Sequence, residues 1–193
     1  MPRIVETIVT TSNAKGEVHI APLGLIEDGA HWIIAPFKPS QTLDNLRANP
    51  SACASHTDDV RVFSGCVTGR KDWPLKPAAR IKGARLADCV SHWELEVDNI
   101  IDDDLRPRFL CKIVHRDTHR PWDGLSRAQA AVLELAVLST RLHMLPAEKI
   151  DTEIKYLEIA ISKTAGSREL EAWGWLIDKI KTWRADPKNI KHA

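Results

Sequence analysis

A lysine and two hydroxyl side chains lie close together in a polar stretch just before a helical segment. Lys38, Ser40 and Thr42 are followed by Leu43 and Leu46 at helical spacing. The unpaired N–H groups at a helix N-terminus bind anions, and lysine and hydroxyl donors strengthen such a site. The stretch has no glycine-rich loop for a triphosphate, so it favours a monophosphate. The alternative is a capped short helix, with Thr42 as its N-cap, beside an exposed lysine.

The elements before this stretch are predicted to be β-strands. Residues 3–11 and 17–26 are rich in Ile, Val and Thr, and the turn signal between them predicts a hairpin. Pro22 and Gly24 interrupt the second strand, which indicates a bulge, a ligand position or an edge irregularity. Residues 31–37 predict a third strand, so the three form an antiparallel meander.

The remaining sequence changes from strands to helices. Residues 51–57, 86–97 and 107–115 predict further strands, with a turn or short helix near residue 60 and a long basic loop over residues 70–85. A helix from Ser126 to Leu145 follows, with Ser126 as its N-cap.

Two more helices are predicted after the first. Pro146 opens one that ends at residues 164–166, and Ser167 caps the other. We therefore expect a β-module of about six strands over residues 1–122, about three helices over residues 123–185 and a disordered tail over residues 186–193.

Composition and charge exclude several functional classes. The 27 basic and 26 acidic residues nearly cancel, which argues against a nucleic-acid-binding protein. No apolar run is long enough to cross a membrane, and Glu6 interrupts any signal-peptide core, so we expect a cytoplasmic protein. The four cysteines form no C-x-x-C pair and are predicted to be buried free thiols.

The sequence offers no catalytic or metal-binding group by pattern alone. His115 and His119 are four residues apart near the end of a strand, where they need not share a face, so a loop or core role is favoured and no metal is expected. The basic loop with Trp73 could bind nucleic acid, but the acidic stretch from Glu94 to Asp104 can neutralise it.

Five segments together resemble a domain-of-unknown-function family of FMN-binding split-barrel proteins from archaea and some bacteria. These segments are VTTSNAKGEVHIAPLG, APFKPSQTLDNL, HTDDVRVFSGCVTG, SRAQAAVLELAVLSTRL and SKTAG. The resemblance covers nearly the whole chain. It implies a split β-barrel with a C-terminal helical appendage, within the superfamily of flavin reductases and pyridoxamine-phosphate oxidases, and a homodimer that binds FMN at its interface.

The resemblance also implies which residues contact the flavin. The strand HIAPLGL would follow the isoalloxazine ring, the next loop would hold the phosphate and ribityl chain, and Asn45 would steady that loop. Asp58 and Asp59 would reach the ribityl hydroxyls or the partner subunit, while Thr10, Thr11 and Asn13 are weaker candidates. The implied contacts with ring and phosphate are His19, Ala21, Pro22, Leu23 and Gly24, then Phe37, Lys38, Pro39, Ser40, Gln41 and Thr42.

The resemblance implies a flavin-dependent oxidoreductase of unknown substrate, with FMN or a deazaflavin as cofactor. Lys38 is the one basic residue in the matching loop, which disfavours a phosphorylated pyridoxine substrate. Two alternatives remain open. One is a non-catalytic flavin-binding accessory protein, in the context of tetrahydromethanopterin-linked one-carbon metabolism, and the other is an anion- or nucleic-acid-binding barrel that uses residues 70–85.

Overall fold

The computed structural model describes residues 1–189, so residues 190–193 of the expected tail lie outside the described part. The chain divides into two compact units. The barrel unit comprises Met1–Asp58 and Asp72–Trp122, and the helical unit comprises residues 59–71 and those from Asp123 onward. Helix α2 (Val60–Val67) thus belongs to the helical unit, although it follows strand β4 in sequence.

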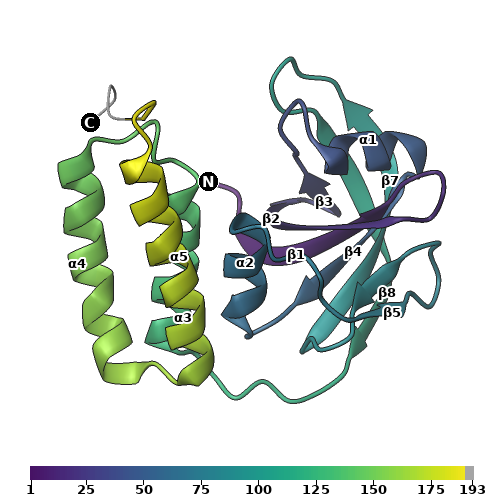
Figure 1. Cartoon of the computed structure of the whole chain (residues 1–193). Helices are drawn as coiled ribbons and strands as arrows, with labels where there is room; N and C mark the ends of the chain where they lie inside the picture. Colours follow the sequence, from purple (N-terminus) through teal and green to yellow (C-terminus); the bar gives the residue numbers. More distant parts are fainter. Residues whose placement is uncertain (190–193) are drawn as a thin grey trace. The chain divides into compact units, whose positions relative to one another are not determined.

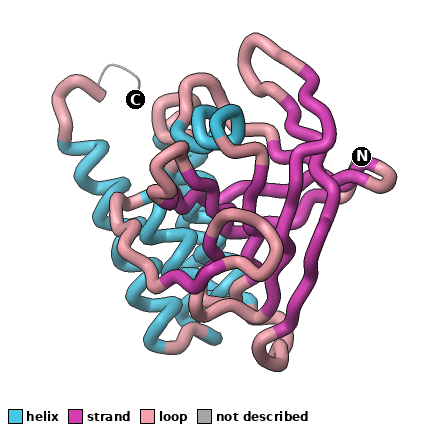
Figure 2. Tube along the Cα trace, turned by 90° about the vertical axis from the view of Figure 1, so that its right-hand side faces the viewer, coloured by secondary structure: helices cyan, strands magenta, loops and turns pink. Residues whose placement is uncertain are grey.

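The barrel unit is a closed six-stranded antiparallel barrel with the strand order β1-β2-β3-β8-β7-β4 (Figures 1 and 2). Its strands are β1 (Ile4–Ser12), β2 (Val18–Asp28), β3 (His31–Ile34), β4 (Ser51–His56), β7 (Ser91–Ile101) and β8 (Arg108–Thr118). This confirms the predicted antiparallel barrel of about six strands and the meander of its first three strands.

The barrel core forms because alternate residues of each strand point inward. Val9, Leu25, Ile34, Leu95 and Phe109 are all buried in one cluster. Of the alternatives for Pro22 and Gly24, the interruption by a bulge is wrong, whereas the edge position is confirmed. β2 is continuous, and Pro22 pairs with Ile8 of β1. A proline is tolerated because residues 18–25 of β2 pair with a neighbour on one side only.

The N-cap of helix α1 (Gln41–Ala48) lies two residues earlier than predicted. Ser40 is the N-cap, and its Oγ accepts a hydrogen bond of 3.4 Å from the Leu43 amide. Thr42 lies inside the helix and is buried. The assignment of Thr42 as the N-cap is therefore wrong, because the chain leaves the extended conformation at Ser40.

The basic stretch over residues 70–85 is not a loop throughout. It contains strand β5 (Leu75–Pro77), which pairs with β6 (Ala84–Leu86) in a separate two-stranded sheet. Ser55 of β4 accepts a hydrogen bond of 3.1 Å from the Leu86 amide. Tertiary contact with the barrel thus orders a segment whose prolines and charges disfavour strands.

The helical unit packs α2 with three longer helices, α3 (Arg127–Ser139), α4 (Ala147–Thr164) and α5 (Ser167–Ala185). The Ser126 N-cap of α3 is confirmed, since its hydroxyl accepts from the Gln129 amide. The helix ends at Ser139 rather than Leu145. The prediction that Ser167 caps the last helix is wrong, because Gly166 is its N-cap and the Glu169 carboxylate accepts from the Gly166 amide.

No helix within residues 1–189 combines the length and the apolar character needed to span a membrane.

Candidate functional site

The barrel is split between β2 and the chain that follows β3. The two strands pair at Ile26–Ile33, Glu27–Trp32 and Asp28–His31, and then separate. Continued in the same register, the pairing would place residues 19–24 opposite residues 35–40. Instead, no strand of the described chain pairs with the outer edge of residues 18–25. The two sets of predicted flavin contacts therefore lie on the two sides of one split.

The far side of the split is held away from β2 by the loop between β7 and β8. The Arg106 guanidinium donates to the Ala35 carbonyl oxygen from Nε at 3.1 Å and from Nη2 at 2.9 Å. The same guanidinium lies 4.4 Å from the ring centroid of the exposed Phe37, and the Lys38 amide donates to the Leu105 carbonyl. These contacts hold residues 35–38 against the β7–β8 loop, and the bond between Lys38 and Leu105 continues the register of the β3–β8 pairing.

The polar loop at the start of α1 forms one end of the split. The Lys38 amine donates to the Asp103 carbonyl oxygen at 2.6 Å, so it rests on the β7–β8 loop. Gln41 and Thr42 occupy the first turn, where backbone N–H groups have no acceptor within the helix. Amide donors, a hydroxyl cap and a lysine thus occupy one helix end.

Asn45 connects this helix to β1, the strand that pairs with β2 on the side away from the split. Its Nδ2 donates to Thr11 Oγ1 at 3.0 Å, and its Oδ1 accepts from the Gln41 side chain at 2.7 Å. Thr11 in turn pairs with His19 of β2. The structure therefore brings Asn45, Gln41 and the His19 end of β2 together.

The side chains of β2 alternate between the two faces of the barrel wall. His19, Ala21 and Leu23 share the face of Val9, which belongs to the core, whereas Pro22 and Gly24 face outward. All five are partly exposed. A ligand along the open edge of this strand would meet mainly backbone groups.

The weaker candidates on β1 and its turn have structural partners. The Thr10 hydroxyl donates to the Ala84 carbonyl, and Thr11 accepts from Asn45. The side-chain oxygen of Asn13 accepts from the amides of Lys15 and Glu17 at 2.9 and 3.0 Å, which closes the hairpin turn.

Asp58 is not brought to the loop before α1. It follows the His56 end of β4, whereas α1 precedes the Ser51 end of the same strand. Both of its carboxylate oxygens accept hydrogen bonds from the Arg120 guanidinium. Asp59 caps α2 within the helical unit and pairs with Arg61 at 2.6 Å.

A cluster of buried histidine and carboxylate side chains on β7 and β8 was not predicted from the sequence. Glu94 is fully buried and accepts hydrogen bonds from the amides of Ala79, Arg80 and Ile81 at 2.5, 2.7 and 2.9 Å. Burial alone would raise the pKa of this carboxyl, but the three N–H donors stabilise the charged form and hold its pKa at about 2.

Three histidines lie near that carboxylate, and His92 contacts it directly. His92 Nε2 lies 3.2 Å from Glu94 Oε1, and His92 Nδ1 lies 2.9 Å from His119 Nε2. The ring of His115 lies 5.7 Å from that of His92, centroid to centroid. His115 and His119 therefore contact the same ring. The sequence places His92 and Glu94 two residues apart on one predicted strand, which indicates that they share a face. Only the fold shows that β8 brings His115 next to them.

A wide groove lies beside the tryptophans of the barrel. It encloses about 1010 Å³, with Trp32 and Trp93 in its wall and their rings 4.8 Å apart. Arg116 lies 5.2 Å from the centroid of Trp93, and Arg3 lines the groove beside Glu27. Charged and aromatic side chains thus both line the groove.

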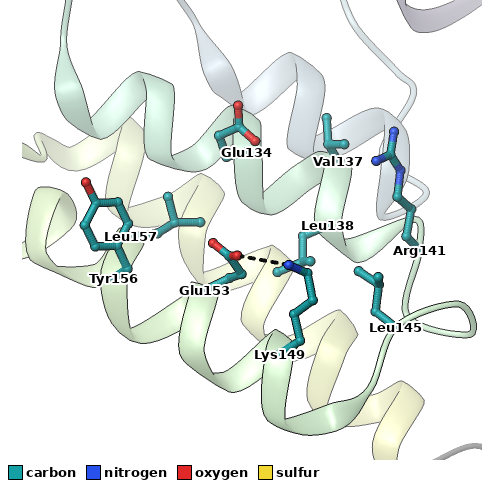
Figure 3. Close-up of a pocket in the computed structure, with 9 residues that line it drawn as sticks. All are labelled: Glu134, Val137, Leu138, Arg141, Leu145, Lys149, Glu153, Tyr156 and Leu157. Carbon is teal, nitrogen blue, oxygen red and sulfur yellow. Dashed lines mark ion pairs between the residues drawn. The ribbon is translucent and has the colours of Figure 1, made fainter.

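The helical unit has a smaller hollow of about 390 Å³ between α3 and α4 (Figure 3). Its wall is apolar at Leu138, Leu145 and Leu157. Lys149 and Glu153 form an ion pair of 3.5 Å at its edge. These side chains do not present a nucleophile beside a base, so the hollow offers no evident chemistry.

Comparison with known sequences assigns the family. Residues 5–120 match the family described as "Protein of unknown function (DUF447) N-terminal domain", and residues 126–178 match its C-terminal counterpart. The chain belongs to the DUF447 family. No curated protein matches this DUF447 protein.

Solved structures share its fold. The FMN-bound DUF447 protein MM1853 from Methanosarcina mazei is 20% identical, with a TM-score of 0.80 over 93% of this chain and 96% of the other. The 2-nitrobenzoate 2-nitroreductase of Pseudomonas fluorescens is 22% identical, with a TM-score of 0.52 over 62% and 66% of the two chains. Flavoredoxin from Methanosarcina acetivorans is 17% identical, with a TM-score of 0.51 over 62% and 69%. The split barrel is thus shared with these structures, and MM1853 shares nearly the whole architecture.

Proposed function

We propose that this DUF447 protein binds FMN without a covalent bond in the split of its barrel. The carrying observation is that the predicted contacts 19–24 and 37–42 follow the two segments that separate at that split, while Asn45 joins α1 to β1, the strand that pairs with β2. The isoalloxazine ring would follow the open edge of β2, and the phosphate would sit at the N-terminus of α1. The overall similarity to an FMN-bound protein supports this assignment.

The residues of the loop suit a phosphate. A dianion at the start of α1 would meet the amides of the first turn, the Ser40 hydroxyl and the Lys38 amine. The Lys38 amine would exchange its neutral acceptor, the Asp103 carbonyl, for a charged one. Such charge-assisted hydrogen bonds are stronger than those between neutral groups.

We further propose that the flavin lies at the interface of a homodimer. No strand of the described chain pairs with the outer edge of residues 20–25, so no strand covers one side of the flavin position. A second copy of the chain would cover it. Light scattering of the flavin-loaded protein should give twice the mass of one chain, and a monomer that retains FMN would contradict this proposal.

We propose an oxidoreductase as the activity. Bound FMN supplies hydride or electron transfer, and the protein binds, orients and tunes it. This role agrees with a site built from backbone groups and phosphate donors. The nitroreductase and the flavoredoxin that share the barrel support a redox role. If neither NADH, NADPH nor a reduced deazaflavin reduces the bound flavin, a non-catalytic accessory role becomes the better assignment.

The phosphate assignment is tested with the double variant Lys38→Ala, Ser40→Ala. Each lost charge-assisted hydrogen bond costs about 1.5–3 kcal/mol, so FMN should bind at least about tenfold more weakly. Riboflavin lacks the phosphate and should bind with unchanged affinity. The matched control is Arg47→Ala, which removes an exposed charge from the last turn of the same helix. Equal losses for FMN and riboflavin would contradict the phosphate assignment.

A further inference from the structure

Two histidines and a glutamate on β7 and β8 place their ligating atoms around one point. Glu94 pairs with His115 across the two strands, and His92 lies on the same face of β7. One nitrogen of each ring and one carboxylate oxygen lie within 4.8 Å of one another. His92 and Glu94 are buried, whereas His115 is partly exposed. A small ion could therefore enter from the His115 side.

The hydrogen bonds of Glu94 leave one oxygen suited to an ion. Oε2 accepts from both Arg80 and Ile81, while Oε1 accepts from the Ala79 amide and faces His92 Nε2 at 3.2 Å. A carboxylate oxygen has two lone-pair sites. A cation in place of the proton between Oε1 and Nε2 would keep all three backbone hydrogen bonds. The buried charge of Glu94 would then have a full positive partner.

The outer nitrogen of His92 also has the partner that a metal-bound histidine requires. Its Nδ1 lies 2.9 Å from His119 Nε2, and His119 Nδ1 lies 3.7 Å from an Asp117 oxygen. A ligating histidine donates its second ring N–H to an acceptor, which sets the orientation of the ring. His119 and Asp117 can fill this outer position while Nε2 faces the ion.

We propose that His92 Nε2, Glu94 Oε1 and a ring nitrogen of His115 bind a divalent first-row transition-metal ion. Two imidazoles and one carboxylate match the donor set of such sites and leave a coordination position open. Ligands about 2.0–2.2 Å from one ion lie roughly 3–4 Å apart, so the site closes by about 1 Å on binding. The partly exposed His115 ring can make that movement. The site does not depend on the flavin proposal.

Zinc binding to the full chain tests the proposal. The protein is treated with a chelator, dialysed against graded Zn²⁺ and analysed for metal by mass spectrometry. The wild type should hold one ion per chain. His115→Ala should weaken binding by more than about tenfold, and His119→Ala should weaken it by about 10–100-fold, as for other outer-sphere partners.

The matched control is His31→Ala. His31 is another partly exposed barrel histidine, whose Nε2 lies 2.9 Å from an Asp98 oxygen, and its removal should leave zinc binding unchanged. Zinc should also raise the melting temperature of the wild type but not that of His115→Ala. Absence of stoichiometric zinc, or equal affinity in wild type and His115→Ala, would overturn the proposal. The apo melting temperature of each variant shows that the fold is intact.

Discussion

The side-chain amide of Asn45 donates a 3.0 Å hydrogen bond to Thr11 Oγ1 and thereby joins α1 to β1 inside the barrel unit. Both residues are buried, so neither group can exchange this partner for water. The bond fixes the helix whose first turn is the proposed phosphate site. The position of that site therefore depends on a residue one turn further along the helix.

Asn45→Ala should destabilise the protein and loosen the flavin. An unsatisfied buried polar group costs about 1–3 kcal/mol, and the phosphate site would lose its fixed position. Urea unfolding and FMN titration measure the two effects. Asp44→Ala, on the exposed side of the same helix, is the control and should alter both by far less. If Asn45→Ala bound FMN like the wild type, Asn45 would not position the loop.

Arg106→Ala should partly close the split. The variant loses two hydrogen bonds to the Ala35 carbonyl and the contact with Phe37. We expect a loss of about 1–2 kcal/mol in the free energy of unfolding and several-fold weaker FMN binding. Arg108→Ala removes an exposed guanidinium 3.9 Å from Asp28 and serves as the control. An unchanged FMN affinity in Arg106→Ala would show that this anchor is dispensable.

Glu94→Gln should destabilise the barrel unit without any metal present. The amide places an N–H group where the carboxylate accepts backbone hydrogen bonds from residues 79–81. Losing one such bond to a charged acceptor costs about 2–3 kcal/mol. Denaturant unfolding of the chelator-treated protein measures it, with Glu96→Gln on the exposed face of β7 as control. Equal stability of the two variants would contradict the anchoring role.

The cysteines should resist thiol reagents in the folded state. All four are buried and free, as predicted, and burial raises the pKa of Cys53 and Cys111 to about 12 and that of Cys66 to about 11. The thiolate is the reactive form, so at pH 8 the folded protein should react slowly and the urea-unfolded protein should release four equivalents. Fast reaction of the folded protein would contradict this burial.

The same pKa shifts predict loss of stability in alkali. In the unfolded chain the thiols ionise near their ordinary pKa of 9.0, whereas Cys53 and Cys111 in the folded chain keep their protons to about pH 12. The folded state then binds more protons, so its stability falls as the pH rises above about 9. The midpoint of urea unfolding should decrease between pH 9 and pH 11, and a midpoint independent of pH would contradict the prediction.

The sequence by itself determined the six barrel strands, their alternation and the helical character of the last third. Apolar periodicity and turn residues act locally, and they specified β1, β2, the Ser126 cap and the polar residues before α1. Local signals predicted N-caps at Thr42 and Ser167, but the N-caps are Ser40 and Gly166. The first helical residue depends on the backbone conformation of the preceding segment, which tertiary contacts determine.

Only the tertiary structure decided where the split and the histidine cluster lie. At the split, Arg106 from the β7–β8 loop binds the chain after β3, and this chain does not pair with residues 18–25 of β2. Glu94 is held by amides of residues 79–81, and His92 meets His115 and His119 from a second strand. Contacts between segments far apart in the chain leave no periodic trace in the sequence, so the fold alone brings these groups together.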